Sequence, residues 1–228
     1  MRFPERYDRN RNSLSEQQQK RLADAKVLVL GCGGVGGYVI EYLARIGVGH
    51  IAAADGDVFQ APNLNRQLLS TERNLGRQKV VAAQERVAAV NSTVEFAPLP
   101  VMATEENIDE LLRGRDVVID CLDNADSKLL CARAARRAGV PFIHGAISGW
   151  CIRVHAVLPG DESMEWLCTP GSGMEARSGS LPFAAAACAC MEAAEAVKLL
   201  LGIGEHTGSR IIEADLLTMR FDEVELEV

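Results

Sequence analysis

Short apolar runs alternate with longer amphipathic stretches over the first two thirds of the chain. The apolar runs predict buried strands at Val27–Leu30, His50–Ala54, Val94–Pro98, Val117–Cys121 and Val140–His144. The stretches between them predict helices that end near Ile46 or span Lys79–Val90, Glu105–Arg113 and Ser127–Ala138. Asp126 or Ser127 is expected to open the last helix, and Gly139 to close it. This alternation predicts an α/β fold with a largely parallel sheet.

The pattern changes after Gly145. A strand at Ile152–Leu158, an alanine-rich helix at Phe183–Leu201 and a final pair of strands near Arg210–Ala214 and Met219–Glu227 are expected to extend the sheet in a partly antiparallel way. Residues 159–180 show no periodicity, and a loop of that length inside a compact domain is usually functional, so we expect a crossover or lid. Residues 1–20 are polar and are expected to form an N-terminal arm. The chain, residues 1–228, is expected to be a single domain.

The turn between the first strand and its helix is rich in glycine. Gly31, Gly33 and Gly36 fit the pattern G-x-G-x-x-G, and Gly34 lies among them. Glycines let the backbone approach a phosphate, which the amide groups and the dipole at the helix start attract. Asp55 ends the second apolar run, at the separation typical of an acid that binds a ribose hydroxyl. These features predict a Rossmann-like nucleotide site and fit ATP and NAD equally well.

A polar cluster follows the second strand and distinguishes between ATP and NAD as the expected ligand. Its members are Asp57, Asn63, Asn65, Arg66, Gln67 and, about one helix length further on, Lys79. Nicotinamide needs none of them. Arg66 and Lys79 are suited to stabilise charge on an α-phosphate under attack. The cluster therefore favours ATP.

Asp123 follows the buried strand Val117–Cys121 and lies at the carboxyl edge of the predicted sheet. Ligands of open α/β folds bind at this edge, and a carboxylate there can hold Mg²⁺ together with phosphates. The alternative is an ordinary cap or turn made with Asn124. Beside the polar cluster, the magnesium interpretation is favoured.

Composition and charge limit which functions and which cellular compartment are expected. The net charge of −7 argues against broad nucleic-acid binding, and the apolar runs are shorter than a membrane span. No signal peptide is visible in the charged first residues. The cysteines number seven and include no C-x-x-C pair, which suits a reducing, cytoplasmic compartment and gives little support to zinc at Cys188 and Cys190.

The ordered motifs resemble those of the ThiF/MoeB/HesA family, the bacterial relatives of ubiquitin-activating enzymes. They are G-x-G-G-x-G, Asp55-Gly-Asp57, N-L-N-R-Q at 63–67, Gly76–Lys79 and Asp120-Cys-Leu-Asp123-Asn124. The resemblance implies adenylation of the C-terminal glycine of a small β-grasp sulfur-carrier protein ending in Gly-Gly, with ATP consumed and pyrophosphate released. It also implies the roles of single residues: Asp55 binds ribose, Asn63, Arg66 and Lys79 hold phosphates, Gln67 supports them, and Asp123 binds Mg²⁺.

Arg9 is a further residue that the resemblance assigns. In Arg6-Tyr7-Asp8-Arg9-Asn10 it is similar to the family's R-Y-x-R-Q arm, although Asn10 replaces the usual glutamine. The second arginine of that arm reaches the ATP of the other subunit, which implies a homodimer with two composite sites. A mobile arm is the alternative.

The chain departs from the family in its thiols. Many relatives carry two C-x-x-C pairs for zinc and this chain carries neither, so we expect a short form with no metal beyond Mg²⁺. Some relatives link covalently to the carrier through a cysteine in the crossover loop, where only Cys168 lies here, without a matching flank. Histidines such as His144, at a strand end near the site, are expected to be structural. Trp150 and Trp166 are expected to pack in the core rather than to contact a carrier tail.

Three other functions stay open on the sequence. Relatives that dehydrate threonylcarbamoyladenosine in tRNA share the adenylation core and an N-x-N-R-Q cluster, which Asn65 fits. An NAD-dependent oxidoreductase fits the glycine loop and Asp55 but leaves Arg66, Lys79 and Asp123 without a role. A catalytically silent binding module is disfavoured by the intact set of motifs.

Overall fold

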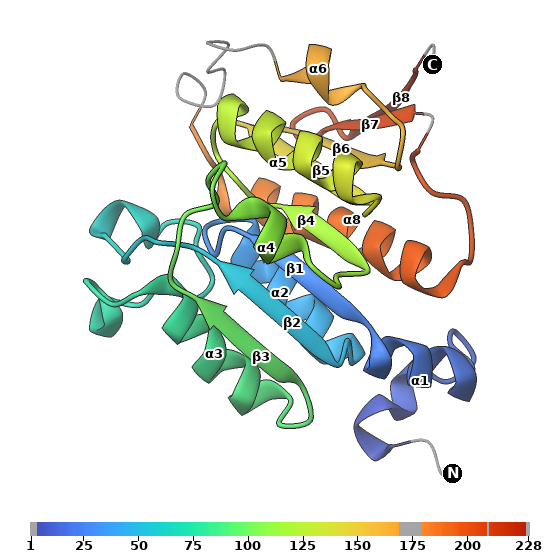
Figure 1. Ribbon diagram of the computed structural model, residues 1–228. Coiled ribbons are helices and arrows are strands. Elements are labelled where there is room, and N and C mark those ends of the chain that lie inside the picture. Colours follow the sequence, from blue (N-terminus) through green and yellow to red (C-terminus); the bar gives the residue numbers. More distant parts are fainter. Residues whose placement is uncertain (1–3, 169–178, 209, 227–228) are drawn as a thin grey trace.

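The protein contains one eight-stranded sheet, seen in a computed structural model that describes residues 4–168, 179–208 and 210–226 (Figure 1). The strand order is β3-β2-β1-β4-β5-β6-β7-β8, and the first five strands of this order are parallel. The strands are β1 (Lys26–Leu30), β2 (His50–Ala54), β3 (Glu95–Leu99), β4 (Val117–Asp120), β5 (Phe142–Ser148), β6 (Cys151–Val157), β7 (Arg210–Asp215) and β8 (Arg220–Glu225). β5 to β8 pair antiparallel, which confirms a Rossmann-like α/β fold extended by antiparallel strands.

Helices cover both faces of the sheet. One layer holds α1 (Glu16–Asp24), α2 (Gly36–Ile46), α3 (Lys79–Val90) and α8 (Pro182–Leu201), and the other holds α4 (Ile108–Leu112), α5 (Ala125–Ala138) and α6 (Met164–Leu167). Side chains of β1 alternate between two cores: Val27 and Val29 face the first layer, and Leu28 and Leu30 face the second. Among the described residues, no helix is both long and apolar enough to cross a membrane.

The N-terminal segment carries helical elements that the sequence analysis did not predict. A 3₁₀ helix, η1 (Glu5–Asn10), is followed by α1, which a capping box between Ser15 and Gln18 opens. Buried Gln19 donates to the carbonyl of Ile46 at 2.7 Å. The buried Tyr7 hydroxyl accepts from Asn91 at 2.8 Å. These few contacts fix a mostly polar segment to the last residues of α2 and to the end of α3.

Several predicted boundaries were wrong. The predicted helix Glu105–Arg113 is reduced to α4, because Asn107 accepts from the amide of Thr104 and organises a turn before it. α5 begins two residues before Ser127, since Asn124 is its N-cap and accepts from the Ser127 amide at 2.8 Å. β5 runs beyond His144 to Ser148 because it pairs with β6 along its whole length. The predicted loop 159–180 contains α6, and its residues 169–178 lie outside the described part of the chain.

Two short 3₁₀ helices, η2 (Ala61–Asn63) and η3 (Glu72–Asn74), lie between β2 and α3. They shape the segment that contains the polar cluster.

Candidate active site

The glycine loop joins β1 to α2 at the carboxyl edge of the sheet, between β2 and β4, where the strand order reverses. Gly31 has φ of +96°, and a Cβ there would lie 2.6 Å from the carbonyl oxygen of Cys121. A Cβ at Gly36 would lie 1.9 Å from the carbonyl oxygen of Gly31. Both positions therefore require glycine, and the tight turn aims the first amides of α2 at the space above the sheet.

Arg66 and Gln67 border this loop. A Cβ added to Gly34 would lie 3.4 Å from the Arg66 side chain, and one added to Gly33 would lie 3.6 Å from the Gln67 amide nitrogen. Gln67 is 6% exposed, and its Oε1 is buried without a hydrogen-bond partner. Half-buried Arg66 donates through Nη1 to the Pro62 carbonyl at 3.1 Å and to Asn65 Oδ1 at 2.9 Å. Orphaned and charged polar groups beside a glycine cradle fit a phosphate-bearing ligand.

Asp55 and Lys79 form the second wall. Asp55 accepts from the amide of Cys32 at 2.7 Å and from that of Asp57 at 2.8 Å. The Lys79 ammonium lies 2.9 Å from Asp57 and 3.7 Å from Asp55. Asp55 therefore ties β2 to the glycine loop, and Lys79 is held near it by two carboxylates. Ribose binding by Asp55 and phosphate binding by Lys79 stay predictions.

The two asparagines of the cluster play different structural parts. Asn63 Oδ1 accepts from the amide of Gln60 at 2.9 Å and stabilises η2. Asn65 donates to the carbonyl of Ser180 at 3.1 Å. Ser180 also lies in an isolated bridge with Gly149, at the turn between β5 and β6. The polar cluster is thus joined to the segment that leads into α8, and phosphate binding by Asn63 stays a prediction.

Asp123 is exposed, next to the N-cap of α5 and at the same sheet edge. Asn124 Nδ2 lies 3.4 Å from its Oδ1. Within the described residues, no group of three or more His, Cys, Asp or Glu side chains has the arrangement of a metal site. Binding of Mg²⁺ by Asp123 stays a prediction.

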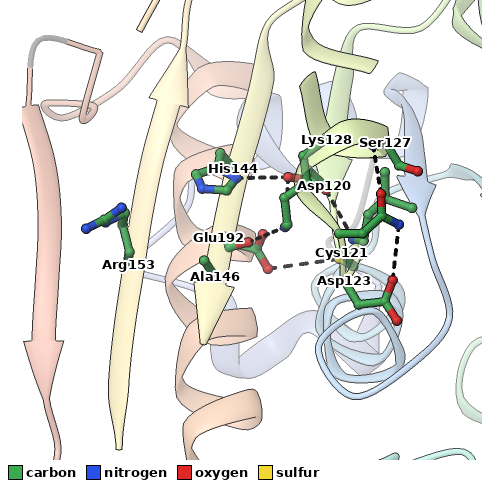
Figure 2. Close-up of polar contacts among 12 residues, drawn as sticks. Asp120, Cys121, Asp123, Ser127, Lys128, His144, Ala146, Arg153 and Glu192 are labelled. Carbon is green, nitrogen blue, oxygen red and sulfur yellow. Dashed lines mark hydrogen bonds and ion pairs between the residues drawn. The ribbon is translucent and has the colours of Figure 1, made fainter. Parts of the chain in front are cut away.

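A buried polar cluster lies beneath this edge, formed by Asp120, Lys128, His144 and Glu192 (Figure 2). Asp120 Oδ2 lies 3.1 Å from Lys128 Nζ and 2.9 Å from His144 Nδ1. Lys128 also donates to the carbonyl of Gly145 at 2.8 Å. Glu192 reaches the cluster from α8, with Oε2 4.0 Å from the Cys121 sulfur and Oε1 without a hydrogen-bond partner. Sequence reasoning did not single out Lys128 or Glu192, although a glutamate inside an alanine-rich helix was a signal.

The protonation states in this cluster follow from burial and neighbouring charge. Burial opposes ionisation of Asp120, but Lys128 and His144 outweigh it and hold the pKa of Asp120 below its ordinary value. Burial lowers the pKa of His144 despite the hydrogen bond to Asp120. Burial, with the Asp120 charge, raises the pKa of Glu192 well above its ordinary value. These directions favour a negative charge on Asp120, an uncharged imidazole at His144 and a protonated carboxyl group at Glu192.

Arg9 and Cys168 lie apart from the glycine loop. Arg9 is exposed on η1, and the blue N-terminal elements lie at the opposite end of the sheet from the loops that follow β1, β2 and β4 (Figure 1). Cys168 is 4% exposed and packs in the core with Leu129 and Met164. A thiol in that place needs movement of its segment before it can meet a carrier. Both catalytic roles stay predictions.

The tryptophans do not pack in the core, contrary to expectation. Trp150 is 41% exposed and Trp166 is 55% exposed. Trp150 lies in the turn between β5 and β6, where its ring centroid is 4.7 Å from that of Phe183 at the start of α8. The pair forms an exposed apolar surface next to the Gly149–Ser180 bridge.

Comparison with known proteins extends over nearly the whole chain. The sequence profile of the ThiF family matches residues 7–228. The SAMP-activating enzyme E1 of Haloferax volcanii is 32% identical over 96% of this chain and 84% of its own length. The sulfur carrier protein adenylyltransferase of Thermus thermophilus is 35% identical over 89% of this chain and 79% of its own length.

Solved structures show the same fold. The crystal structure of Escherichia coli MccB with ATP superposes with a TM-score of 0.84 and covers 98% of this chain and 72% of the MccB chain. The two sequences are 20% identical, so the likeness concerns the fold.

Proposed function

Because the chain belongs to the ThiF family and is an adenylyltransferase, we propose that it uses ATP to adenylate the C-terminal glycine of a small β-grasp sulfur-carrier protein. The observation that carries the proposal is the placement of Arg66 and Gln67 against the glycine loop, with a buried amide oxygen of Gln67 left without a partner. Two relatives that align with most of this chain bear names that refer to activation of SAMP or of a sulfur carrier protein.

The proposed reaction needs no amino-acid nucleophile. A carboxylate oxygen of the carrier attacks the α-phosphorus of ATP, a new P–O bond forms, and the bond to the β-phosphate breaks with release of pyrophosphate. The protein holds the reactants in line and stabilises the developing charge, which Arg66 and Lys79 are suited to do. Asp123 would hold Mg²⁺, which neutralises phosphate charge when bound. Asp55 would orient the ribose from its position under the loop.

The Trp150–Phe183 pair would contact the apolar part of the carrier near its tail. Both rings are exposed. Trp150 lies in the turn after β5 and Phe183 in α8, and the carbonyl of Ser180, just before α8, accepts from Asn65 of the polar cluster. Contiguous exposed apolar surface is typical of protein-binding sites, and the two rings lie against each other. We also propose a cytoplasmic enzyme, in keeping with its odd number of cysteines.

We propose that the enzyme is a homodimer in which Arg9 acts on the ATP of the partner subunit. Its exposed position, at the other end of the sheet from the glycine loop of the same chain, supports action across an interface. Mixing inactive Arg9→Ala and Asp123→Ala proteins tests this. Random exchange of subunits in a two-fold dimer would restore about a quarter of wild-type activity, since half the dimers would contain one intact composite site. No recovery after demonstrated subunit exchange would refute the role of Arg9.

ATP–pyrophosphate exchange tests the proposed function. It should require Mg²⁺ and a carrier ending in Gly-Gly, and it should be lost when the carrier lacks that tail. Arg66→Ala and Asp123→Ala should each lower exchange by about 100-fold or more while circular dichroism stays unchanged. Near-normal exchange in both variants would contradict the site. ATP hydrolysis triggered by modified tRNA, with no effect of the carrier tail, would instead establish the dehydratase alternative.

A further inference from the structure

The buried carboxylate of Asp120 joins the turn that carries Asp123 to the neighbouring elements. Its Oδ1 accepts from the amide of Leu122 at 3.1 Å, one residue before Asp123. Its Oδ2 contacts Lys128 of α5 and His144 of β5. Asp120 is fully buried, and Lys128 and His144 are each 3% exposed. One side chain therefore connects the turn with the helix and the strand on either side of it (Figure 2).

Two further contacts extend this connection through the sheet. Lys128 donates to the carbonyl of Gly145, so α5 is tied to the strand after β4. A Cβ at Gly145 would lie 2.2 Å from Glu192 Oε1, so α8 packs directly against the same point from the other face. Glu192 Oε2 of α8 also lies 4.0 Å from the Cys121 sulfur, so α5, β5 and α8 all contact residues 120–121 at the start of the turn. Asp123 itself projects from the turn and lies outside this buried set.

We propose that Asp120 is a positioning residue for the active site: it fixes the turn 121–124 so that Asp123 stands at the correct place for the metal-bound nucleotide. The inference rests on the proposed function, because Asp120 would act on nucleotide binding through the position of Asp123 and would not take part in the chemical step. Residues that orient a metal ligand affect metal affinity or activity by about 10- to 100-fold when they are replaced. A structural role alone would change stability and leave this affinity as it was.

The test uses Asp120→Asn, which keeps the shape of the side chain and an acceptor for Leu122 but removes the charge that holds Lys128. A fluorescent ATP analogue is titrated against the full-length protein with Mg²⁺ and with EDTA. We expect the variant to lose about tenfold in the affinity measured with Mg²⁺ and to match wild type in EDTA. Amide hydrogen exchange of residues 121–124, measured without nucleotide, should become faster. Asp116→Asn is the matched control, because Asp116 accepts from the amide of Lys26 at 2.7 Å just before the same strand.

His144→Phe provides a second variant that leaves no buried charge without its partner. It removes one contact to Oδ2 and should give the same changes to a smaller degree. Folded variants with wild-type affinity for the ATP analogue in Mg²⁺ and wild-type amide hydrogen exchange in the turn would overturn the inference. If Asp120→Asn does not fold, His144→Phe decides by the same two readouts. If wild-type protein binds no nucleotide, the proposed function fails, and exchange in the turn still decides whether Asp120 positions it.

Discussion

The two strands that flank β1 are each closed by a buried aspartate, and the pair shows how one local pattern gives two different structures. Asp55 directly follows the last residue of β2, and its side chain accepts from the amide two residues ahead, at 2.8 Å. Asp120 ends β4 and does the same at 3.1 Å. Each aspartate is followed by an exposed acid, Asp57 or Asp123, and each has a buried lysine from the next helix beside it.

The two lysines make the difference. Lys79, the first residue of α3, points its ammonium at the exposed Asp57, whose side chain is 62% exposed, and lies further from Asp55. Lys128, one turn into α5, stays on the fully buried Asp120 and on a backbone carbonyl. Lys79 therefore contacts an exposed carboxylate beside the glycine loop, whereas Lys128 belongs to the buried support beneath it, which is the cluster of Asp120, Lys128, His144 and Glu192.

Removing Lys128 should produce the largest effect in this comparison. Lys128→Met leaves the buried charge of Asp120 without its cation, which costs about 3–5 kcal/mol of folding free energy. Urea unfolding measures the loss, and Lys79→Met should lose clearly less because Asp55 keeps its two backbone donors. The double variant Lys128→Met/Asp120→Asn should be more stable than Lys128→Met alone. Equal stability of the single and double variants would show that the charge pair is not the cause.

When activity is measured in place of stability, removing Lys79 should have a larger effect than removing Lys128. Lys79→Met should lower ATP–pyrophosphate exchange by about 100- to 1000-fold, because the proposed function gives this ammonium the task of stabilising phosphate charge. Thermal unfolding reports whether the fold is intact, and Lys20→Met is the control, because Lys20 is an exposed residue of α1. Wild-type exchange in Lys79→Met would mean that Lys79 serves only to neutralise Asp55 and Asp57.

The sequence predicted the surface of the site better than its support. The glycine loop, Asp55 and the polar cluster were singled out because glycine spacing and strand ends can be read from the local sequence, and their roles in binding stay predictions. The sequence pattern did not show that Asp55 has both oxygens occupied by backbone amides, since that depends on where the glycine loop folds back.

The buried support was missed for a different reason. Lys128 and Glu192 are separated by 64 positions and meet only because α5 and α8 cover opposite faces of the same strands. The N-terminal helix α1 was missed because it buries one apolar side chain, Leu22, and the polar Gln19, and a single apolar position makes no periodic stripe. Contacts between residues from helices on opposite faces of a sheet leave no periodic pattern in the local sequence.

The smallest expected effect concerns Glu192 and appears as a pH dependence. The pKa of Glu192 is raised in the folded state above its ordinary value of 4.5, so folding favours the protonated carboxyl group. As the pH rises above 4.5 the unfolded chain releases this proton while the folded chain keeps it, and wild-type stability falls until the folded pKa is reached. Glutamine does not ionise, so Glu192→Gln should be more stable than wild type at neutral pH.

Urea unfolding at pH 4.5 and at pH 7.5 measures this difference, which should be close to zero at the lower pH and grow at the higher one. Glu165→Gln is the matched control of opposite sign. Its hydrogen bond to Arg133 lowers the pKa of Glu165, so that pair stabilises the fold at neutral pH and loses its effect as the pH falls. A Glu192→Gln protein that loses stability as the pH rises, in parallel with wild type, would show that Glu192 is ionised in the fold. The support of the site would then carry a second buried negative charge, and the neutral contact between α8 and β5 would have to be abandoned.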